Sequence, residues 1–217
     1  MTAMRNQIAN GSDVMWLADA TRHLSTCDRV MAGLVERFGV CGLKPREDRF
    51  AALVSMIIGQ QLGKSAADTI RSRVLELSGG LSPGAILSLD KVDLRRAGLS
   101  GAKIEYILSI SQGIEAGTLD LNNIPDGDDD AEAVLRSIRG VGRWTAHMFM
   151  IFVLCRKDVL PIDDVAIRSA VAELYGVSKT EASEHLVDIA MPWSPYRSAA
   201  CWYLYAHVNG GTTPEMG

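Results

Sequence analysis

Two adjacent carboxylates in the segment Leu160–Arg168 are the residues best suited to chemistry in this sequence. Asp163 and Asp164 follow Pro161 and stand where a predicted helix over 164–175 begins. A fixed carboxylate can stabilise positive charge that develops in a transition state, and it can orient an attacking water molecule. Aspartate is also a favoured helix N-cap. The spacing alone therefore leaves both a catalytic and a capping role open.

A pair of glycines marks a second segment that could bind a ligand, the run Leu135–Ala146. Its pattern is a helix, then Gly140, Val141 and Gly142, then an apolar helix. Glycine lets the chain turn tightly and approach a ligand closely, because it has no Cβ. Backbone N–H groups at a helix start can hold a phosphate. We expect Val141 to fold inward and the hairpin to bind phosphate; the alternative is that the two glycines only form a turn.

The elements that must position these segments are helices. Apolar side chains recur every three or four residues along most of the chain, which is typical of amphipathic helices. The sequence therefore predicts an all-α fold, without convincing strand pairing. The expected helices cover residues 14–38, 48–59, 63–77, 84–88, 90–96, 100–115, 130–138, 143–155, 164–175, 179–190 and 195–208.

Composition excludes several classes of protein. Hydrophobic residues make up 47% and charged residues 22% of the 217 residues, which are ordinary globular values. The formal net charge of −4 argues against a protein that coats nucleic acid through bulk positive charge. The longest uncharged apolar run, Met148–Cys155, is much shorter than the roughly 20 residues of a membrane span. The N-terminus has no signal-peptide pattern, so we expect a soluble, cytoplasmic protein.

Metal-binding patterns are weak in this sequence. The spacing of the four cysteines matches no zinc site, which favours small apolar side chains in a reducing compartment. The acidic run 120–133 lacks the ligand pattern of a calcium loop. We expect it to be a solvated loop whose aspartates cap the next helix. No metal ion held by side chains is expected.

The pattern I-x-G-V-G-x-x-T-A around Gly140–Gly142 resembles the helix-hairpin-helix of the base-excision DNA glycosylases, the HhH-GPD superfamily. The resemblance covers about residues 48–208 and is strongest to the branch of 3-methyladenine DNA glycosylase II. It implies that the hairpin binds the DNA backbone, with a monovalent cation at its carbonyl groups. The pattern L-P-x-D-D resembles the same branch and implies that Asp164 is catalytic, while Asp163 caps the helix. Asp164 would stabilise the positive charge that forms on the sugar as the N-glycosidic bond breaks.

The resemblance also implies a monofunctional enzyme. Bifunctional members carry a lysine just after the hairpin glycines, and its amine forms a Schiff base with the sugar. Trp144 occupies that position here, and Lys157 lies beyond the second hairpin helix. The iron–sulfur branch has four clustered cysteines near the C-terminus, where this chain has only Cys201. We therefore expect hydrolysis by water, with no required cofactor and no iron–sulfur cluster.

A base pocket is implied by the segment Trp193–Ala200, which resembles the W-x-P-W-R-S-x-A pattern of the alkylated-base branch. Alkylated purines are electron-poor, and aromatic faces attract them. The expected pocket residues are Trp144, Tyr205, Met148, Gln60 and Trp202. Met148 replaces a tyrosine of that branch, which leaves the substrate preference open. The alternative is that Trp202 and Tyr205 are core aromatics, as we expect for Trp16.

Contacts to the duplex are implied by two further loops, Ile58–Leu62 and the run Gly98–Lys103, which resembles a family loop near the DNA backbone. The run Ile58–Leu62 matches the loop that penetrates the duplex, so Gln61 or Leu62 is expected to fill the space left by a flipped base. The alternative is a plain turn between helices. The remaining contacts to the DNA backbone are assigned to Arg143, Thr145, Lys103 and Arg168, although Arg168 could instead pair with Asp164.

The expected architecture is two helical lobes with an active-site cleft between them. One lobe covers about 46–160, with the hairpin at 130–155, and the other covers about 1–45 and 161–217. We expect a monofunctional glycosylase that removes flipped alkylated bases, such as 3-methyladenine, from double-stranded DNA. The alternatives are a same-fold glycosylase for deaminated or mismatched bases and a non-catalytic hairpin module that only binds DNA. The protein is expected to be monomeric, and nucleoid-associated in a bacterium.

Overall fold

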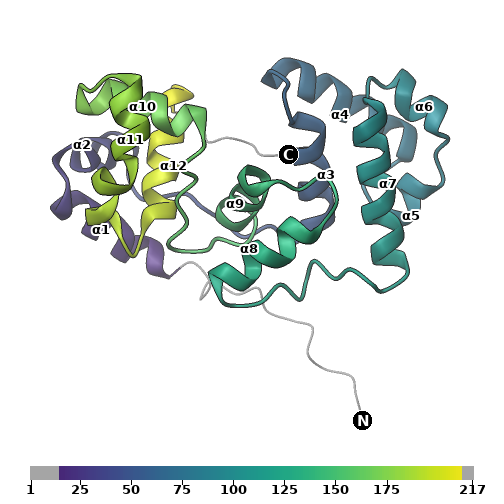
Figure 1. Cartoon of the computed structure of the whole chain (residues 1–217), viewed down its shortest axis with the longest axis horizontal. Coiled ribbons are helices and arrows are strands. Elements are labelled where there is room, and N and C mark those ends of the chain that lie inside the picture. Colours follow the sequence, from purple (N-terminus) through teal and green to yellow (C-terminus); the bar gives the residue numbers. More distant parts are fainter. Residues whose placement is uncertain (1–14, 212–217) are drawn as a thin grey trace, which may run out of the picture. The chain divides into compact units, whose positions relative to one another are not determined.

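The computed structural model describes residues 15–211, and every regular element in that range is a helix (Figure 1). The predicted all-α class is therefore confirmed. Within those residues the chain forms two compact units. Unit 1 contains residues 15–47 and 151–211, and unit 2 contains residues 48–150. Unit 2 is thus one continuous segment, whereas unit 1 is assembled from two separate segments.

Unit 1 is organised around its last helix, α12, which is buried along most of its length from Ser198 to Ala206. Helices α1, α2 and α10 pack against α12, and α11 packs against α10. In Figure 1 these helices form one group around the yellow α12. The elements are α1 (Trp16–Cys27), α2 (Arg29–Phe38), α10 (Val165–Tyr175), α11 (Lys179–Ile189), the 3₁₀ turn η1 (Met191–Trp193) and α12 (Arg197–Val208).

Unit 2 is organised around α3, whose residues Ala52–Ile58 are all buried. Helices α4 and α7 pack against α3, and α5 packs against α7. The elements are α3 (Arg49–Gly59), α4 (Lys64–Ser78), α5 (Pro83–Leu87), α6 (Lys91–Arg96), α7 (Gly101–Glu115), α8 (Asp128–Ser137) and α9 (Arg143–Phe152), whose last two residues belong to unit 1.

The single helix predicted over 14–38 is wrong, because the chain breaks at Asp28 (residue 14 lies outside the described residues). Asp28 is extended, with φ −149° and ψ 126°, and its Oδ1 accepts the N–H groups two and three residues on. Its Oδ2 accepts the Tyr175 hydroxyl at 2.7 Å and the Trp193 indole N–H at 3.2 Å. The carboxylate thus starts α2 and ties that start to two later segments.

Two smaller predictions are also corrected. The helix predicted over 143–155 ends at Phe152; the Val153 carbonyl accepts the Arg46 N–H at 3.0 Å, and Cys155 has a left-handed φ of 51°. The aspartates of the acidic run do not cap α8, because its N-cap is Gly127 and they form its first turn, where negative charge suits the helix dipole. The other predicted helices differ from the structure by at most two residues at either end.

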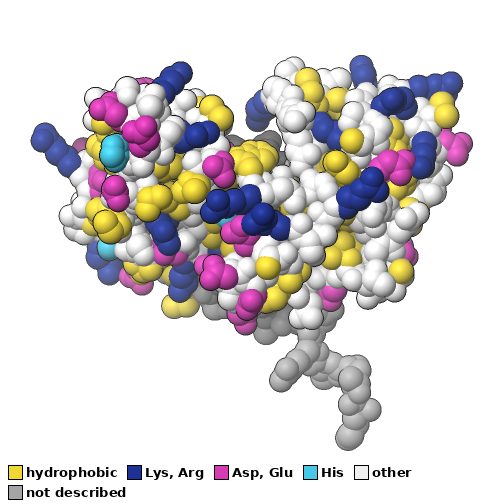
Figure 2. Space-filling view, viewed as in Figure 1, with side chains coloured by type: hydrophobic (Ala, Val, Ile, Leu, Met, Phe, Trp, Pro, Cys, Tyr) yellow, Lys and Arg dark blue, Asp and Glu magenta, His cyan; other side chains and the backbone are white. Residues whose placement is uncertain are grey.

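Charges of both signs are mixed on the surface. On the face that Figure 2 shows, blue basic side chains stand among magenta acidic ones over both units. This fits the net charge of −4 and leaves no broad basic face in that view. From residue 15 to residue 211 no helix is both long and apolar enough to cross a membrane. None of the four cysteines forms a disulfide, and Cys41, Cys155 and Cys201 are buried as predicted.

Candidate functional site: a buried carboxylate and a glycine hairpin

Asp164 lies at the start of α10 and is only 4% exposed. Its Oδ1 accepts the backbone N–H of Ile167 at 2.8 Å, and its Oδ2 accepts the hydroxyl of Tyr205 at 2.5 Å. Each carboxylate oxygen therefore has a donor from the fold, one from α10 and one from α12. Charge-assisted hydrogen bonds of this kind hold an anion in a fixed orientation.

The expected division of labour between the two aspartates is wrong in one respect. Asp164, not Asp163, is the N-cap of α10. The backbone oxygen of Asp163 instead accepts Nη2 of Arg168 at 3.0 Å. Capping and catalysis are compatible in one aspartate. A cap uses one carboxylate oxygen, so capping by Asp164 fixes its side chain without removing its charge.

Tyr205 has a role that the sequence did not reveal. Its side chain is 7% exposed and meets the Phe152 ring edge to face, with ring centroids 5.5 Å apart. Burial, and then the charge of Asp164, raises the pKa of Tyr205 well above its ordinary value. The hydroxyl therefore stays protonated and donates to the carboxylate. The sequence gives one indication of this role: position 205 is tyrosine, whereas the related branch has tryptophan there.

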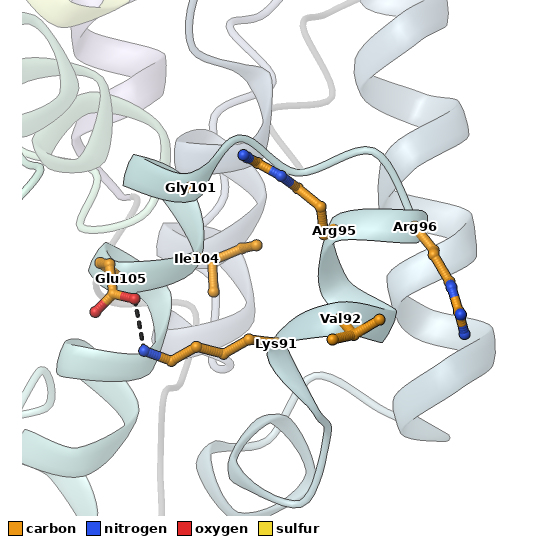
Figure 3. Close-up of a pocket in the computed structure, with 7 residues that line it drawn as sticks. All are labelled: Lys91, Val92, Arg95, Arg96, Gly101, Ile104 and Glu105. Carbon is orange, nitrogen blue, oxygen red and sulfur yellow. Dashed lines mark hydrogen bonds and ion pairs between the residues drawn. The ribbon is translucent and has the colours of Figure 1, made fainter.

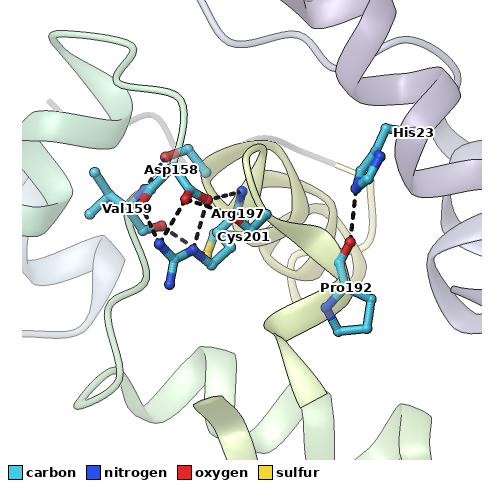
Figure 4. Close-up of polar contacts among 8 residues, drawn as sticks. His23, Asp158, Val159, Pro192, Arg197 and Cys201 are labelled. Carbon is cyan, nitrogen blue, oxygen red and sulfur yellow. Dashed lines mark hydrogen bonds and ion pairs between the residues drawn. The ribbon is translucent and has the colours of Figure 1, made fainter. Parts of the chain in front are cut away.

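The loop that leads to Asp164 is anchored by the Arg-Ser pair of the C-terminal motif (Figure 4). Arg197 Nε and Nη2 donate to the two carboxylate oxygens of Asp158, each at 2.7 Å. Ser198 Oγ accepts the Val159 N–H at 3.0 Å, and its own N–H donates to the Lys157 oxygen at 3.1 Å. The first turn of α12 thus holds residues 157–159 and fixes the chain that enters the site.

A second contact in Figure 4 fixes the other end of the same motif. His23 Nε2 on α1 donates to the Pro192 carbonyl at 2.8 Å. The Tyr196 ring lies edge to face with His23 and stacks on Trp16, with centroids 5.4 and 6.0 Å away. Trp16 is buried, as expected for a core residue.

Replacing Asp158 with asparagine should destabilise the protein by roughly 2 kcal/mol at pH 7, because a bidentate charge-assisted pair is lost. Burial alone would raise the pKa of Asp158, but hydrogen bonds from Arg197 and Ser194 outweigh it and lower that pKa. Because the pKa of Asp158 is lower in the folded than in the unfolded protein, the ionised side chain stabilises the fold at pH values above the unfolded-state pKa, near 3.9. This stabilisation disappears as the pH falls through the folded-state pKa. Melting temperatures of both proteins should therefore converge as the pH falls through the folded-state pKa of Asp158; a pH-independent difference would contradict this.

The hairpin between α8 and α9 uses its two glycines differently. Gly140 has a φ of 91°, and a Cβ there would lie 2.4 Å from the Tyr106 ring. The fold itself therefore requires Gly140. Val141 is buried, as predicted. A Cβ at Gly142 would meet no neighbouring atom within 4 Å, so the packing of the chain gives no reason for a glycine there.

The loop after α3 is tied to this hairpin inside unit 2. Gln60 Nε2 donates to the Gly140 carbonyl at 3.0 Å and to the Thr145 hydroxyl at 3.1 Å. Gln61 is exposed and has a left-handed φ of 59°, which is unusual for a residue with a side chain. Leu62 is 39% exposed. The structure thus brings together Gln60, Gly140 and Thr145, and presents the two candidate wedge residues at the surface.

Two residues assigned to the DNA backbone have partners within the fold. Lys103 Nζ donates to the carbonyls of Ile58 and Gln60, both at 2.7 Å, so its charge supports the C-terminal end of α3. Burial lowers the pKa of Lys103. Thr145 is buried, and its hydroxyl accepts the Gln60 amide. Both residues therefore position the loop and the hairpin, a role that depends on contacts far apart in sequence.

Arg143, at the start of α9, lies near a carboxylate of α8. Its Nε is 3.7 Å from Glu132 Oε1, an oxygen that also accepts Arg136 Nη1 at 3.1 Å. The other oxygen of Glu132 lies 2.9 Å from Nε2 of the buried His147. Glu132 thus links the two hairpin helices and partly neutralises the basic side chains beside the hairpin.

The aromatic and apolar candidates separate into exposed and buried groups. Trp144 is 36% exposed at the second position of α9. Met148, an expected pocket residue, has no exposed surface. Trp202 is buried, lies edge to face with Tyr203, and would contact a Cβ at Gly42 at 3.1 Å. Trp202 is thus a core aromatic, the alternative that the sequence had left open.

A pocket of about 380 Å³ lies between α6 and α7 (Figure 3). Its basic side chains have partners in the fold: Lys91 pairs with Glu105 at 2.6 Å, and Arg95 is 3.5 Å from the Leu99 carbonyl. Arg96 pairs with Asp93 at 3.3 Å. None of the candidate catalytic residues lines it. Elsewhere in residues 15–211, no group of three or more His, Cys, Asp or Glu side chains is placed to hold a metal ion.

Comparison with known proteins gives consistent matches. Residues 54–195 match the sequence model described as HhH-GPD superfamily base excision DNA repair protein. The DNA-3-methyladenine glycosylase 1 of Schizosaccharomyces pombe is 30% identical over 199 residues, which cover 87% of this chain and 86% of that protein.

Solved structures agree with the sequence matches. The structure of an S. pombe 3-methyladenine DNA glycosylase in complex with abasic DNA has a TM-score of 0.77 and 29% identity, covering 88% of this chain and 97% of that one. A DNA-3-methyladenine glycosidase from Bacillus halodurans has a TM-score of 0.71 and 32% identity, covering 94% and 93%.

Proposed function

The chain belongs to the HhH-GPD superfamily of base excision DNA repair proteins, and from this premise we propose that it is a DNA glycosylase that hydrolyses the N-glycosidic bond of alkylated bases. The similar proteins named above as 3-methyladenine glycosylases support this substrate class. The observation that carries the proposal is Asp164, a buried carboxylate with a donor on each oxygen. A module that only binds an anionic backbone would need this residue only as the cap of α10, a role that uncharged asparagine or serine fills equally well.

The proposed reaction begins with binding to the DNA backbone. The open approach to Gly142 leaves room for a phosphate close to backbone N–H groups at the start of α9. Gln61 or Leu62 then enters the duplex and fills the space of the flipped nucleotide. Base flipping costs a few kcal/mol of unstacking, which an inserted side chain partly restores.

Asp164 acts on the flipped nucleotide. As the N-glycosidic bond breaks, positive charge develops on the sugar, and the oriented carboxylate stabilises it. Water completes the hydrolysis. The exposed indole of Trp144 offers a face for an electron-poor, often cationic, base.

The reaction is proposed to need no cofactor. In the hairpin, the Ile138 carbonyl accepts the Val141 N–H and the Gly140 carbonyl accepts the Gln60 side-chain amide. A carbonyl oxygen has two lone pairs, so each of these oxygens keeps one with which it could coordinate a monovalent cation. Such an ion would add positive charge for a phosphate and would supply no chemistry to bond cleavage. We further propose that the protein acts as a monomer.

Absence of lyase activity is proposed from Trp144, which stands where bifunctional relatives carry the Schiff-base lysine. Wild-type protein should release methylated purines from a methylated duplex and leave an intact strand with an abasic site. Borohydride added during turnover should trap no protein–DNA adduct, because no amine attacks the sugar. A covalent adduct on a denaturing gel would contradict the monofunctional mechanism.

Duplexes containing uracil or a mismatched thymine are the substrates that separate this proposal from the same-fold alternative. We expect faster release from the methylated duplex, because a cationic base stacks more strongly on Trp144 than a neutral pyrimidine does. Faster release of uracil or thymine would favour the alternative enzyme. Binding without release from any of these duplexes would favour a non-catalytic module.

A further inference from the structure

We propose that Tyr205 is a positioning residue for the reaction, and that its hydroxyl holds the Asp164 carboxylate in one orientation and in its ionised form. The inference rests on the proposed function, because it assigns a second residue to the same chemistry. It replaces the expected role of Tyr205 as an aromatic wall for the base. The geometry that carries it lies entirely within unit 1.

Two donors approach the carboxylate from different helices. The Ile167 N–H on α10 donates to Oδ1 at 2.8 Å. The Tyr205 hydroxyl on α12 fixes Oδ2 at 2.5 Å. The Tyr205 ring is itself held by burial and by its edge-to-face contact with Phe152. Together the two donors hold both carboxylate oxygens, each from a different helix.

The second donor also bears on the charge of the carboxylate. A hydrogen bond donated to an ionised carboxylate favours the ionised form over the protonated one. Asp164 is almost fully buried, and burial by itself opposes charge. The Tyr205 hydroxyl keeps its proton, because its pKa is raised well above its ordinary value. Tyr205 therefore acts as a permanent donor across the pH range in which the enzyme works.

Other charged and titratable groups around Asp164 act differently. Cys201, one turn before Tyr205 on α12, is buried, and burial raises its pKa far enough that its thiol stays neutral. Arg168 on α10 donates to the Asp163 carbonyl. Asp158 and Arg197, which lie near Cys201, are paired with each other at 2.7 Å. Of these groups, Tyr205 is the one that donates to the Asp164 carboxylate.

A purely structural role for the hydroxyl is the competing explanation. Helices α10 and α12 pack together, so the hydrogen bond could serve only to join them. Tyr203 supplies the matched control, because it lies two residues earlier on α12 and is also buried. Its hydroxyl donates to the Gly39 carbonyl at 2.7 Å, away from Asp164. The same hydroxyl lies 3.2 Å from Thr21 Oγ1. Loss of either hydroxyl therefore removes hydrogen bonding from α12, but only the Tyr205 hydroxyl reaches the carboxylate.

The decisive experiment compares wild type, Tyr205→Phe and Tyr203→Phe in single-turnover base release from a methylated duplex, between about pH 5 and 9. Tyr205→Phe should lower the plateau rate about 10- to 100-fold and move the acid limb to higher pH, because the protonated carboxylate becomes relatively more stable. Affinity for an abasic duplex should stay unchanged. Tyr203→Phe should lower the melting temperature and leave the rate and the acid limb as in wild type. Equal effects of the two variants would overturn the proposal.

Two further measurements keep the test decisive. Fluorotyrosine at position 205 is a stronger donor of nearly the same shape, so it should move the acid limb to lower pH even if the phenylalanine variant folds poorly. The Asp164 carboxyl signal in ¹³C NMR should titrate at higher pH in Tyr205→Phe than in wild type, and this readout needs no base release. A wild-type protein that releases no base would refute the proposed function, whereas an unshifted NMR titration would refute the role of Tyr205.

Discussion

Replacing Asp164 with asparagine is expected to reduce single-turnover base release from a methylated duplex by about a thousandfold. Asparagine has the same shape and is an equally good N-cap, so α10 should begin as before. The variant loses the negative charge that would stabilise the sugar cation. It also exchanges one acceptor oxygen for an amide N–H, so the Tyr205 hydroxyl must accept a hydrogen bond where it now donates one. The measurement is the rate of base release at saturating enzyme, together with the melting temperature, which should change little.

Asp163→Asn is the matched control, because it removes the same charge one residue away. The Asp164 carboxylate and its two donors stay in place, so this variant should keep most of the activity. Asp164→Asn should also bind an abasic duplex at least as tightly as wild type does, since one negative charge near the phosphates is gone. Full activity in Asp164→Asn would remove the basis for the proposed mechanism.

The two hairpin glycines should respond in opposite ways to alanine. Gly140→Ala combines a φ of 91° with a Cβ placed 2.4 Å from the Tyr106 ring, so the hairpin must move. We expect a loss of about 3 kcal/mol or more, seen as a much lower melting temperature or insoluble protein. Because this variant is expected to unfold, a loss of its activity would not test whether Gly140 contacts DNA.

Gly142→Ala isolates the ligand-binding role instead. The new Cβ meets no neighbouring atom within 4 Å, so the melting temperature should stay near that of wild type. A phosphate held by backbone N–H groups would meet the methyl group, and affinity for an abasic duplex should fall about tenfold or more. Fluorescence anisotropy at fixed salt measures the affinity. Unchanged DNA binding would show that the hairpin is only a turn.

Most of the helices can be predicted from local sequence patterns. Helical periodicity placed nearly every helix to within two residues, because each amphipathic face is visible within a few turns of sequence. The break at Asp28 was missed since an apolar stripe runs through it without glycine or proline. The side chains that hold Asp28, Tyr175 and Trp193, lie far along the chain, so no local window contains the reason for the break.

The site divides along the same line. The glycines of the hairpin and the Asp-Asp pair were visible as short motifs, because close approach and a fixed charge each need one residue type at one position. No short motif reveals the roles of Gln60, Lys103 and Tyr205, because each of these side chains donates to a partner on another element. Sequence reasoning assigned all three to DNA or base contacts, whereas in the structure each donates hydrogen bonds within its own unit.

The division of unit 1 between residues 15–47 and 151–211 constrains the order of events during synthesis. Helices α1 and α2 leave the ribosome first, yet they pack on α12, and the Tyr175 and Trp193 side chains that reach Asp28 are made much later. Unit 2 is continuous and can fold while these first helices still expose their apolar faces. The Asp164 carboxylate meets Tyr205 only once α12 has emerged, so this pair is assembled after the whole of unit 2 has been synthesised.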